Sequence, residues 1–244
     1  AQAQNAVANS QTALAKQYQD AYNDVVAAYQ DLSPIMSQLQ DVETGTEASR
    51  GSQWNIDYYQ SAITGIRNDA SGITTQRNQV YADYQQALSA YNAAYADYQN
   101  TNQSSSTSTI QSIAQETYAM TQSVGTALDS ANSYIQLYQN VEKGANLTPV
   151  AESTTALSTL ATDVAKVNGD IATLLSDTNG ITSDVQSAQQ NQLSLEQLQQ
   201  GPDSLDLESD QLNIQQQQTA LQQAEDDLSD YTITAPISGT VANL

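Results

Sequence analysis

Histidine and cysteine are both missing from this chain of 244 residues, and phenylalanine is missing as well. Without cysteine there can be no disulfide scaffold, no zinc–thiolate site and no cysteine nucleophile. Without histidine, Ser–His and Cys–His catalysis and most transition-metal sites are excluded too. The sequence also contains no phosphate-binding loop and no nucleophile elbow. We therefore expect a protein that is not an enzyme and that carries no metal and no cofactor.

Basic residues are scarce, because six Lys and Arg stand against 27 Asp and Glu, for a formal net charge of −21. Nucleic-acid binding requires positive side chains that neutralise phosphates, so we exclude nucleic acid as a partner. The same charge argues against a chain that rests on an anionic membrane surface. The acidic residues are instead expected to solubilise long exposed helices.

Long apolar runs are absent as well: the sequence has no stretch of 18 apolar residues and no signal peptide. The chain starts inside a helical pattern and stops just after a β-like segment. We therefore expect it to be a fragment, with a membrane anchor of the full-length protein lying outside it.

Apolar residues make up only 39% of the chain, and 14 tyrosines carry most of its aromatic content. Such a composition suits the thin cores of coiled coils and slender helical bundles. In residues 1–40 the apolar positions recur at steps of three and four, which predicts an outgoing helical arm. Pro34 predicts a kink or a restart within that arm.

Residues 41–201 are predicted to form an inserted helical bundle. Two long heptad runs, over 110–141 and 150–195, indicate helices that bury one apolar stripe each. Gly201 and Pro202 follow the second run and predict a helix break, because glycine often ends helices and proline cannot continue them.

A third seam within this region is built mostly of tyrosine. Six residues are spaced by 3, 4, 3, 4 and 3 positions, as a and d positions of a heptad are: Tyr81, Tyr84, Leu88, Tyr91, Tyr95 and Tyr98. One interpretation is a ladder of rings that binds sugars or peptides. The interpretation we favour is a packed seam whose hydroxyls reach water at its edge.

Residues 202–230 predict a returning helical arm, and residues 231–244 switch to a strand pattern with a turn at Pro236 and Gly239. The fold class we predict is mainly α. A long antiparallel coiled-coil hairpin is widened into a three- or four-helix bundle, and a short β segment follows at the C-terminus.

The helix break, the Gln-rich helix and the stretch after it together resemble hemolysin-secretion-D type membrane fusion proteins, the periplasmic adaptor subunits of efflux pumps and type I secretion systems. The resemblance covers about 45 of the 244 residues. The positions that match the family's β motif are Thr232, Ile233, Ala235, Pro236, Gly239 and Val241.

In that family a helical hairpin is inserted between the two halves of a lipoyl-like domain. The resemblance thus implies that 231–244 opens the second half, and no Lys follows Lys166 to carry a lipoyl cofactor. The family's Arg-x3-Leu-x6-Ser motif for docking on an outer-membrane channel does not occur at Arg50, Arg67 or Arg77.

The resemblance implies a non-catalytic adaptor in the extracytoplasmic cell envelope, membrane-anchored in the full-length protein. Its helical hairpin would be a spacer and docking arm between an inner-membrane transporter, of ABC or other efflux type, and an envelope partner such as an outer-envelope channel. A homo-oligomer is expected. The alternative is an extracytoplasmic helical-bundle sensor or ligand-binding domain.

Overall fold

The structure, a computed structural model of the chain, describes residues 1–67, 69–201, 204–231 and 239. These residues are mainly helical, as the sequence predicts. The described helices are α1 (Gln2–Thr44), α2 (Asn55–Ile66), α3 (Ala70–Gln99), α4 (Thr107–Gly144), α5 (Ala151–Gln200) and α6 (Ser204–Asp230). Contacts divide the chain into two units, residues 1–190 and 191–244.

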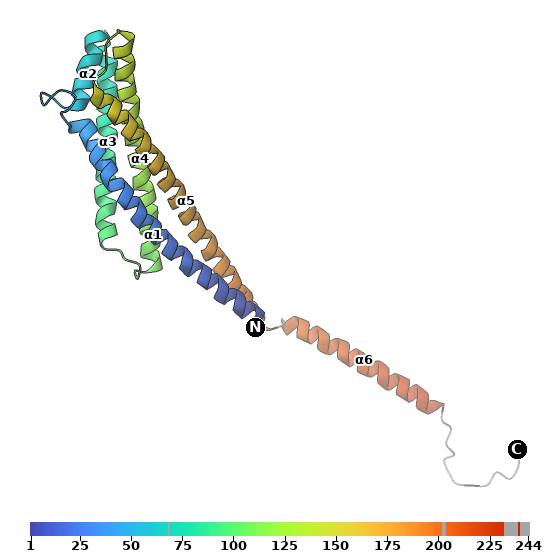
Figure 1. Ribbon diagram of the computed structural model, residues 1–244. Coiled ribbons are helices and arrows are strands. Elements are labelled where there is room, and N and C mark those ends of the chain that lie inside the picture. The colour runs from blue at the N-terminus through green and yellow to red at the C-terminus, as the bar shows by residue number, and fades with distance from the viewer. Residues whose placement is uncertain (68, 202–203, 232–238, 240–244) are drawn as a thin grey trace. The chain divides into compact units, whose positions relative to one another are not determined.

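In the first unit α1, α3, α4 and α5 pack side by side, and the short α2 lies against them at one end (Figure 1). The end that holds α2 and the start of α5 is called the distal end below. One large core cluster contains side chains from all five helices, and a smaller one joins α1, α4 and α5.

Helix α4 is the most deeply buried helix of the bundle, and its heptad pattern explains why. Every apolar position of the predicted run is buried, from Ile110 through Val124 to Val141. The helix presents small residues such as Ala127 and Ala131 beside larger ones such as Tyr134, so its neighbours can approach closely.

Helix α1 continues through Pro34 from Gln2 to Thr44. The restart that Pro34 suggested is therefore wrong. Proline lacks the N–H that would bond back to the residue four positions earlier. On both sides of it, however, Leu32 and Ile35 are buried in the main core, and this packing holds the helical path across the missing hydrogen bond.

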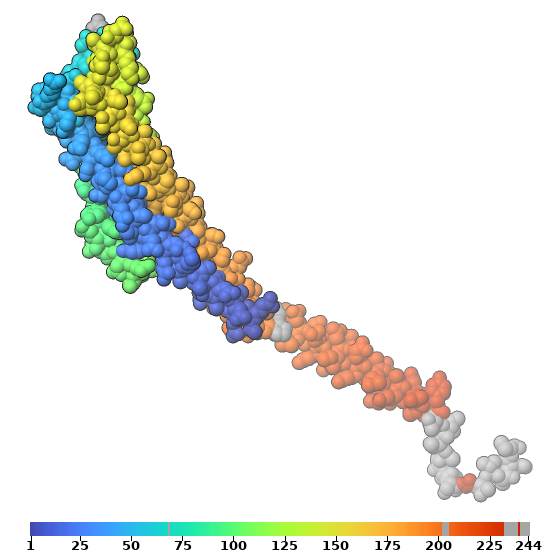
Figure 2. Space-filling view, in the orientation of Figure 1, coloured from blue at the N-terminus to red at the C-terminus, as the bar shows by residue number. Residues whose placement is uncertain are grey.

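Helices α1 and α5 are antiparallel neighbours. Lys166 of α5 lies 3.1 Å from the carboxylate of Asp31, whereas Asp177, further along α5, accepts a hydrogen bond of 3.2 Å from Gln17. The residue numbers rise along α5 as they fall along α1. Figure 2 shows the surfaces of α1 and α5 running beside each other. Within the first unit, the returning partner of α1 is thus α5.

In the second unit, α5 ends at Gln200 and Gly201 takes a φ of +74°, in the left-handed region where glycine commonly ends a helix. Every described side chain of α6 is exposed, including Leu207, Ile214 and Leu221 at seven-residue spacing. The predicted β segment lies outside the described residues, apart from Tyr231 and Gly239, which are both exposed.

Candidate functional site

A cavity of about 460 Å³ opens at the distal end of the bundle, between the last turns of α1, the loop 45–54, and the starts of α2 and α5. We call it the distal cavity. Its apolar lining includes Val42, Tyr59, Ala156 and Leu160, and all but Ala156 are buried. Ligand sites in proteins commonly have volumes of about 300–1,000 Å³ and mostly apolar walls. Its size and lining thus make this cavity the candidate site.

Asn55 fixes the wall of the distal cavity that the loop provides. Its side-chain amide donates to the backbone oxygen of Asp41 at 2.9 Å and to Oε2 of Glu47 at 3.1 Å, and its Oδ1 accepts from the backbone N–H of Ala48 at 2.8 Å. Gly45 is needed here because a Cβ at this position would lie 2.3 Å from the Asp41 backbone oxygen. The loop is therefore held to both α1 and α2 rather than hanging free.

The charged groups that line the distal cavity are acidic. They are Asp41, Glu47 and Glu152, and none of the described residues that line the cavity is basic. Hydrogen bonds from its own backbone N–H and from Asn55 lower the pKa of Glu47, which favours its ionised form. Among the described residues, Oε1 of Gln38 is buried without a hydrogen-bond partner.

Tyr59, the one aromatic residue among the described residues that line the cavity, belongs to a cluster of tyrosine rings. The Tyr59 and Tyr138 ring centroids are 4.7 Å apart, and Tyr58 packs edge-on against both. The Tyr138 hydroxyl accepts from the backbone N–H of Val150 at 3.1 Å and so ties the turn before α5 to α4. Burial raises the pKa of Tyr59 above its ordinary value, so its hydroxyl stays neutral.

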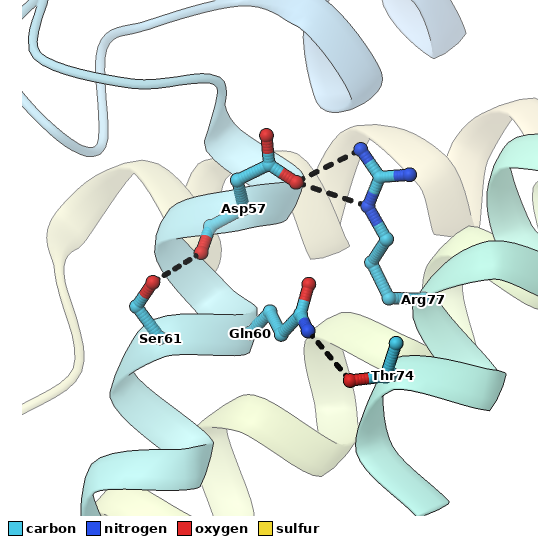
Figure 3. Close-up of polar contacts among 5 residues, drawn as sticks. All are labelled: Asp57, Gln60, Ser61, Thr74 and Arg77. Atoms are coloured by element: carbon cyan, nitrogen blue, oxygen red, sulfur yellow. Dashed lines mark hydrogen bonds and ion pairs between the residues drawn. The ribbon is translucent and has the colours of Figure 1, made fainter. Parts of the chain in front are cut away.

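A partly exposed ion pair joins α2 to α3. Arg77 of α3 donates to one carboxylate oxygen of Asp57 of α2, from Nε at 2.9 Å and from Nη2 at 2.8 Å (Figure 3). Gln60 and Thr74 add a hydrogen bond of 2.9 Å between the same two helices. This contact holds α2 against α3.

Glu43 lies near this ion pair but is not bonded to it. Its side chain is 1% exposed, and within the described part of the chain neither carboxylate oxygen has a hydrogen-bond partner. The pKa of Glu43 is raised to about 7: burial is the main cause, the charge of Arg77 opposes it, and the charge of Asp57 adds to it. A buried carboxylate without partners is costly to ionise, so Glu43 destabilises the fold at alkaline pH.

Substitution of Glu43 by Gln is expected to stabilise the protein at pH 8 by about 2 kcal/mol, because glutamine has a similar shape but carries no charge that must be buried. Denaturant unfolding measures this gain. The gain should shrink towards zero at pH 4, where Glu43 of the native protein is already protonated. Equal gains at both pH values would contradict the assignment of the effect to the charge.

A row of carboxylates lies between α1 and α5. Asp163, Asp170 and Asp177 recur every seven residues on α5, each with an Oδ2 that is buried without a partner in the described structure. They face Asp24 and Asp31 of α1, whose charges raise their pKa values. We call these five residues the acidic seam.

Burial is the first cause of the raised pKa values in the acidic seam. It raises the pKa of Asp170 to about 6 and that of Asp177 to about 7. Lys166 opposes the shift at Asp163 and at Asp170. At neutral pH this interface therefore holds carboxyl groups close to their titration midpoints.

The tyrosines predicted to form a heptad seam lie on α3 but are not equally buried. Tyr84 is 4% exposed, whereas Tyr81 and Tyr95 are 36% and 37% exposed. Residues that directly precede three of the predicted seam positions are buried instead: Val80, Ala87 and Ala94. Small side chains take the centre because they permit close helix approach, and the bulkier rings lie at the edge.

Three of these rings make one cluster with a tyrosine of α1. Tyr29 stacks on Tyr98 with centroids 4.3 Å apart, and Tyr91 and Tyr95 lie within 6.0 Å of it. Burial raises the pKa of Tyr29 to about 12. Leu88, the remaining seam residue, is partly buried against the main core. The rings contact one another and α1, which is the arrangement of a packed seam.

Most residues of the β motif that carries the family resemblance lie outside the described part of the chain. Pro202 and the motif residues Thr232, Ile233, Ala235, Pro236 and Val241 lie outside the described residues, and Gly239 is described only as exposed. The distal cavity, the buried Glu43 and the acidic seam were not predicted from the sequence. Only the acidic seam has a sequence signal, the repeat of Asp every seven residues beside the apolar run.

Among the described residues no group of three or more acidic side chains is arranged to hold a metal ion. No described helix is both long enough and apolar enough to cross a membrane. Neither a family model, nor a curated protein, nor a solved structure matches the chain.

Proposed function

We propose that this chain is the helical part of a non-catalytic adaptor in the cell envelope, a membrane fusion protein of a transport or secretion complex. Its partners would be a membrane transporter of the ABC or other efflux type and an envelope partner such as an outer channel. The protein would be extracytoplasmic, homo-oligomeric and anchored to the membrane through segments outside this chain. The resemblance of residues 201–241 to such adaptors supports the proposal.

The observation that carries the mechanical part of this proposal is the length of α1 and its continuous packing. At 1.5 Å per residue, its 43 residues correspond to about 65 Å. The antiparallel α5, joined to α1 by apolar packing and by the Lys166–Asp31 pair, stiffens it. A spacer of this kind acts through its length and rigidity and performs no bond chemistry.

The finer proposal is the hairpin itself, with residues 1–40 as the outgoing arm, 41–201 as the inserted bundle and 202–230 as the returning arm. The exposed stripe of α6 supports it, because Leu207, Ile214 and Leu221 are 49–60% exposed at heptad spacing. A helix with such a stripe gains stability when the stripe packs against another helix.

Spin-label distances test the hairpin, and the absence of cysteine makes labelling clean. In a hairpin with these arms, labels at Asn23→Cys and Ala220→Cys should give a short and narrow distance distribution. The matched control is Gln30→Cys with Ala165→Cys, next to the Lys166–Asp31 contact. A broad or long distribution for the first pair, together with a short one for the control, would rule the hairpin out.

The second candidate function is ligand binding by the bundle, in a sensor or ligand-binding domain. The distal cavity is the specific observation that favours it, because its size and its mixed apolar and polar lining suit a small molecule. The two functions are compatible, since a cavity at the distal end leaves the α1–α5 pair free to act as a spacer.

A further inference from the structure

We propose that the distal cavity binds a small organic ammonium ion, a molecule with an apolar body and a charged nitrogen that carries N–H groups. This inference rests on the second candidate function and adds the chemical class of the ligand. The adaptor function does not depend on it.

The apolar body is matched by the inner lining. Val42, Tyr59 and Leu160 are buried side chains from α1, α2 and α5 that line the cavity. A volume of about 460 Å³ admits an aromatic ring or a short aliphatic chain. A bare metal ion would gain nothing from such walls, because hard cations require several oxygen ligands converging on one point.

The charge is matched by the polar lining. Glu47 is held in place by Asn55, which donates to its Oε2, and the Glu47 carboxylate is part of the cavity lining. Glu152 in the first turn of α5 and Asp41 near the end of α1 add two further acidic groups. Because none of the described lining residues is basic, the three acidic side chains would repel an anionic ligand without compensation from a cation.

The N–H groups are matched by the carboxylates of the lining, Asp41, Glu47 and Glu152. An ammonium N–H donates a charge-assisted hydrogen bond to a carboxylate oxygen, and such bonds are about twice as strong as neutral ones. A quaternary ammonium carries the same charge but has no N–H to donate. The acidic lining thus favours primary or secondary ammonium ions over quaternary ones.

The only tryptophan, Trp54, directly precedes Asn55 in the cavity wall and can report binding through its fluorescence. The experiment titrates the full chain with benzylammonium, with the neutral isostere benzyl alcohol, with benzyltrimethylammonium and with benzoate. We expect benzylammonium to bind at least about tenfold more tightly than benzyl alcohol, with benzyltrimethylammonium weaker than benzylammonium and benzoate weakest.

Two substitutions locate the charge effect. The double variant Glu47→Gln with Glu152→Gln keeps an acceptor for Asn55 and should weaken benzylammonium binding by about tenfold while leaving benzyl alcohol unchanged. Glu196→Gln, on α5 but outside the cavity, is the matched control and should change neither. Circular dichroism of each variant confirms that the helices are intact.

The possible outcomes separate the two ideas. If benzyl alcohol binds as tightly as benzylammonium, and the double variant binds both unchanged, the cavity binds ligands but the ammonium class is wrong. If none of the four probes changes the Trp54 signal or shows binding by calorimetry up to millimolar concentrations, both the ligand class and the ligand-binding function fall, and the adaptor proposal stands as before.

Discussion

The bundle is expected to unfold at a temperature about 5–10 °C higher at pH 5 than at pH 8. Most proteins whose carboxylates form ion pairs behave in the opposite way, because acid removes those pairs. Here the important carboxyl groups are buried against one another. The pKa is about 6 for Asp170 and about 7 for Asp177 and Glu43.

The sign follows from proton binding. An unfolded aspartate has a pKa of about 3.9, so between about pH 4 and pH 7 the native protein binds more protons than the unfolded chain. Stability therefore falls as pH rises through this range and is lowest above pH 7. The seam groups are partly solvated, so water screens part of the effect, and we expect about 3 kcal/mol in all between pH 5 and pH 8.

The triple variant Asp163→Asn, Asp170→Asn and Asp177→Asn should raise the unfolding temperature at pH 8 and flatten its pH dependence. Near-UV circular dichroism is the readout, because every tyrosine except Tyr231 lies in the first unit.

The matched control changes three exposed aspartates of α6 to Asn, namely Asp210, Asp226 and Asp227, and alters the net charge by the same amount. If the control produces the same shift as the seam variant, then overall charge repulsion is responsible and the seam is not.

The buried positions of a helix could be predicted from the sequence where the periodicity of that helix alone determines its inner face. In α4 the predicted positions from Ile110 to Val141 are all buried, because a helix at the centre of a bundle needs only its own periodicity to determine its inner face. In α3 the helix was predicted correctly, but apart from Tyr84 the buried face lies one residue earlier, at Val80, Ala87 and Ala94, because the size of a side chain decides how near the axis of the bundle it can lie.

The candidate site could not be predicted in this way. The distal cavity is lined by residues within 38–59 and within 151–160, two stretches far apart in the sequence, and no local pattern predicts that they meet. The burial of Glu43 could not be predicted either, because it depends on where α2 and α3 pack against α1. The acidic seam could have been predicted from the Asp that recurs every seven residues on α5. Acidic residues in a chain with a net charge of −21 are expected to be solvated, however, and so these were not expected to be buried.

Two adjacent leucines of α5 give the sharpest test of how this helix packs. Leu174 is completely buried in the main core, whereas Leu175 is 41% exposed. The substitution Leu174→Ala should destabilise the first unit by about 3 kcal/mol, because it removes buried methyl groups and leaves a cavity that the helices cannot close. Leu175→Ala should cost less than about 1 kcal/mol, because alanine favours the helix and only partly buried surface is lost.

The comparison is well matched, since both substitutions remove the same atoms from neighbouring positions of one helix. Denaturant unfolding followed by near-UV circular dichroism gives both free energies, and the slope m should stay constant if the two native states remain equally compact. Similar losses for the two variants would mean that α5 packs in another register. The description of the acidic seam would then be wrong as well. Asp170 lies four residues before Leu174 and Asp177 lies three residues after it, so both share the face of the helix that carries Leu174.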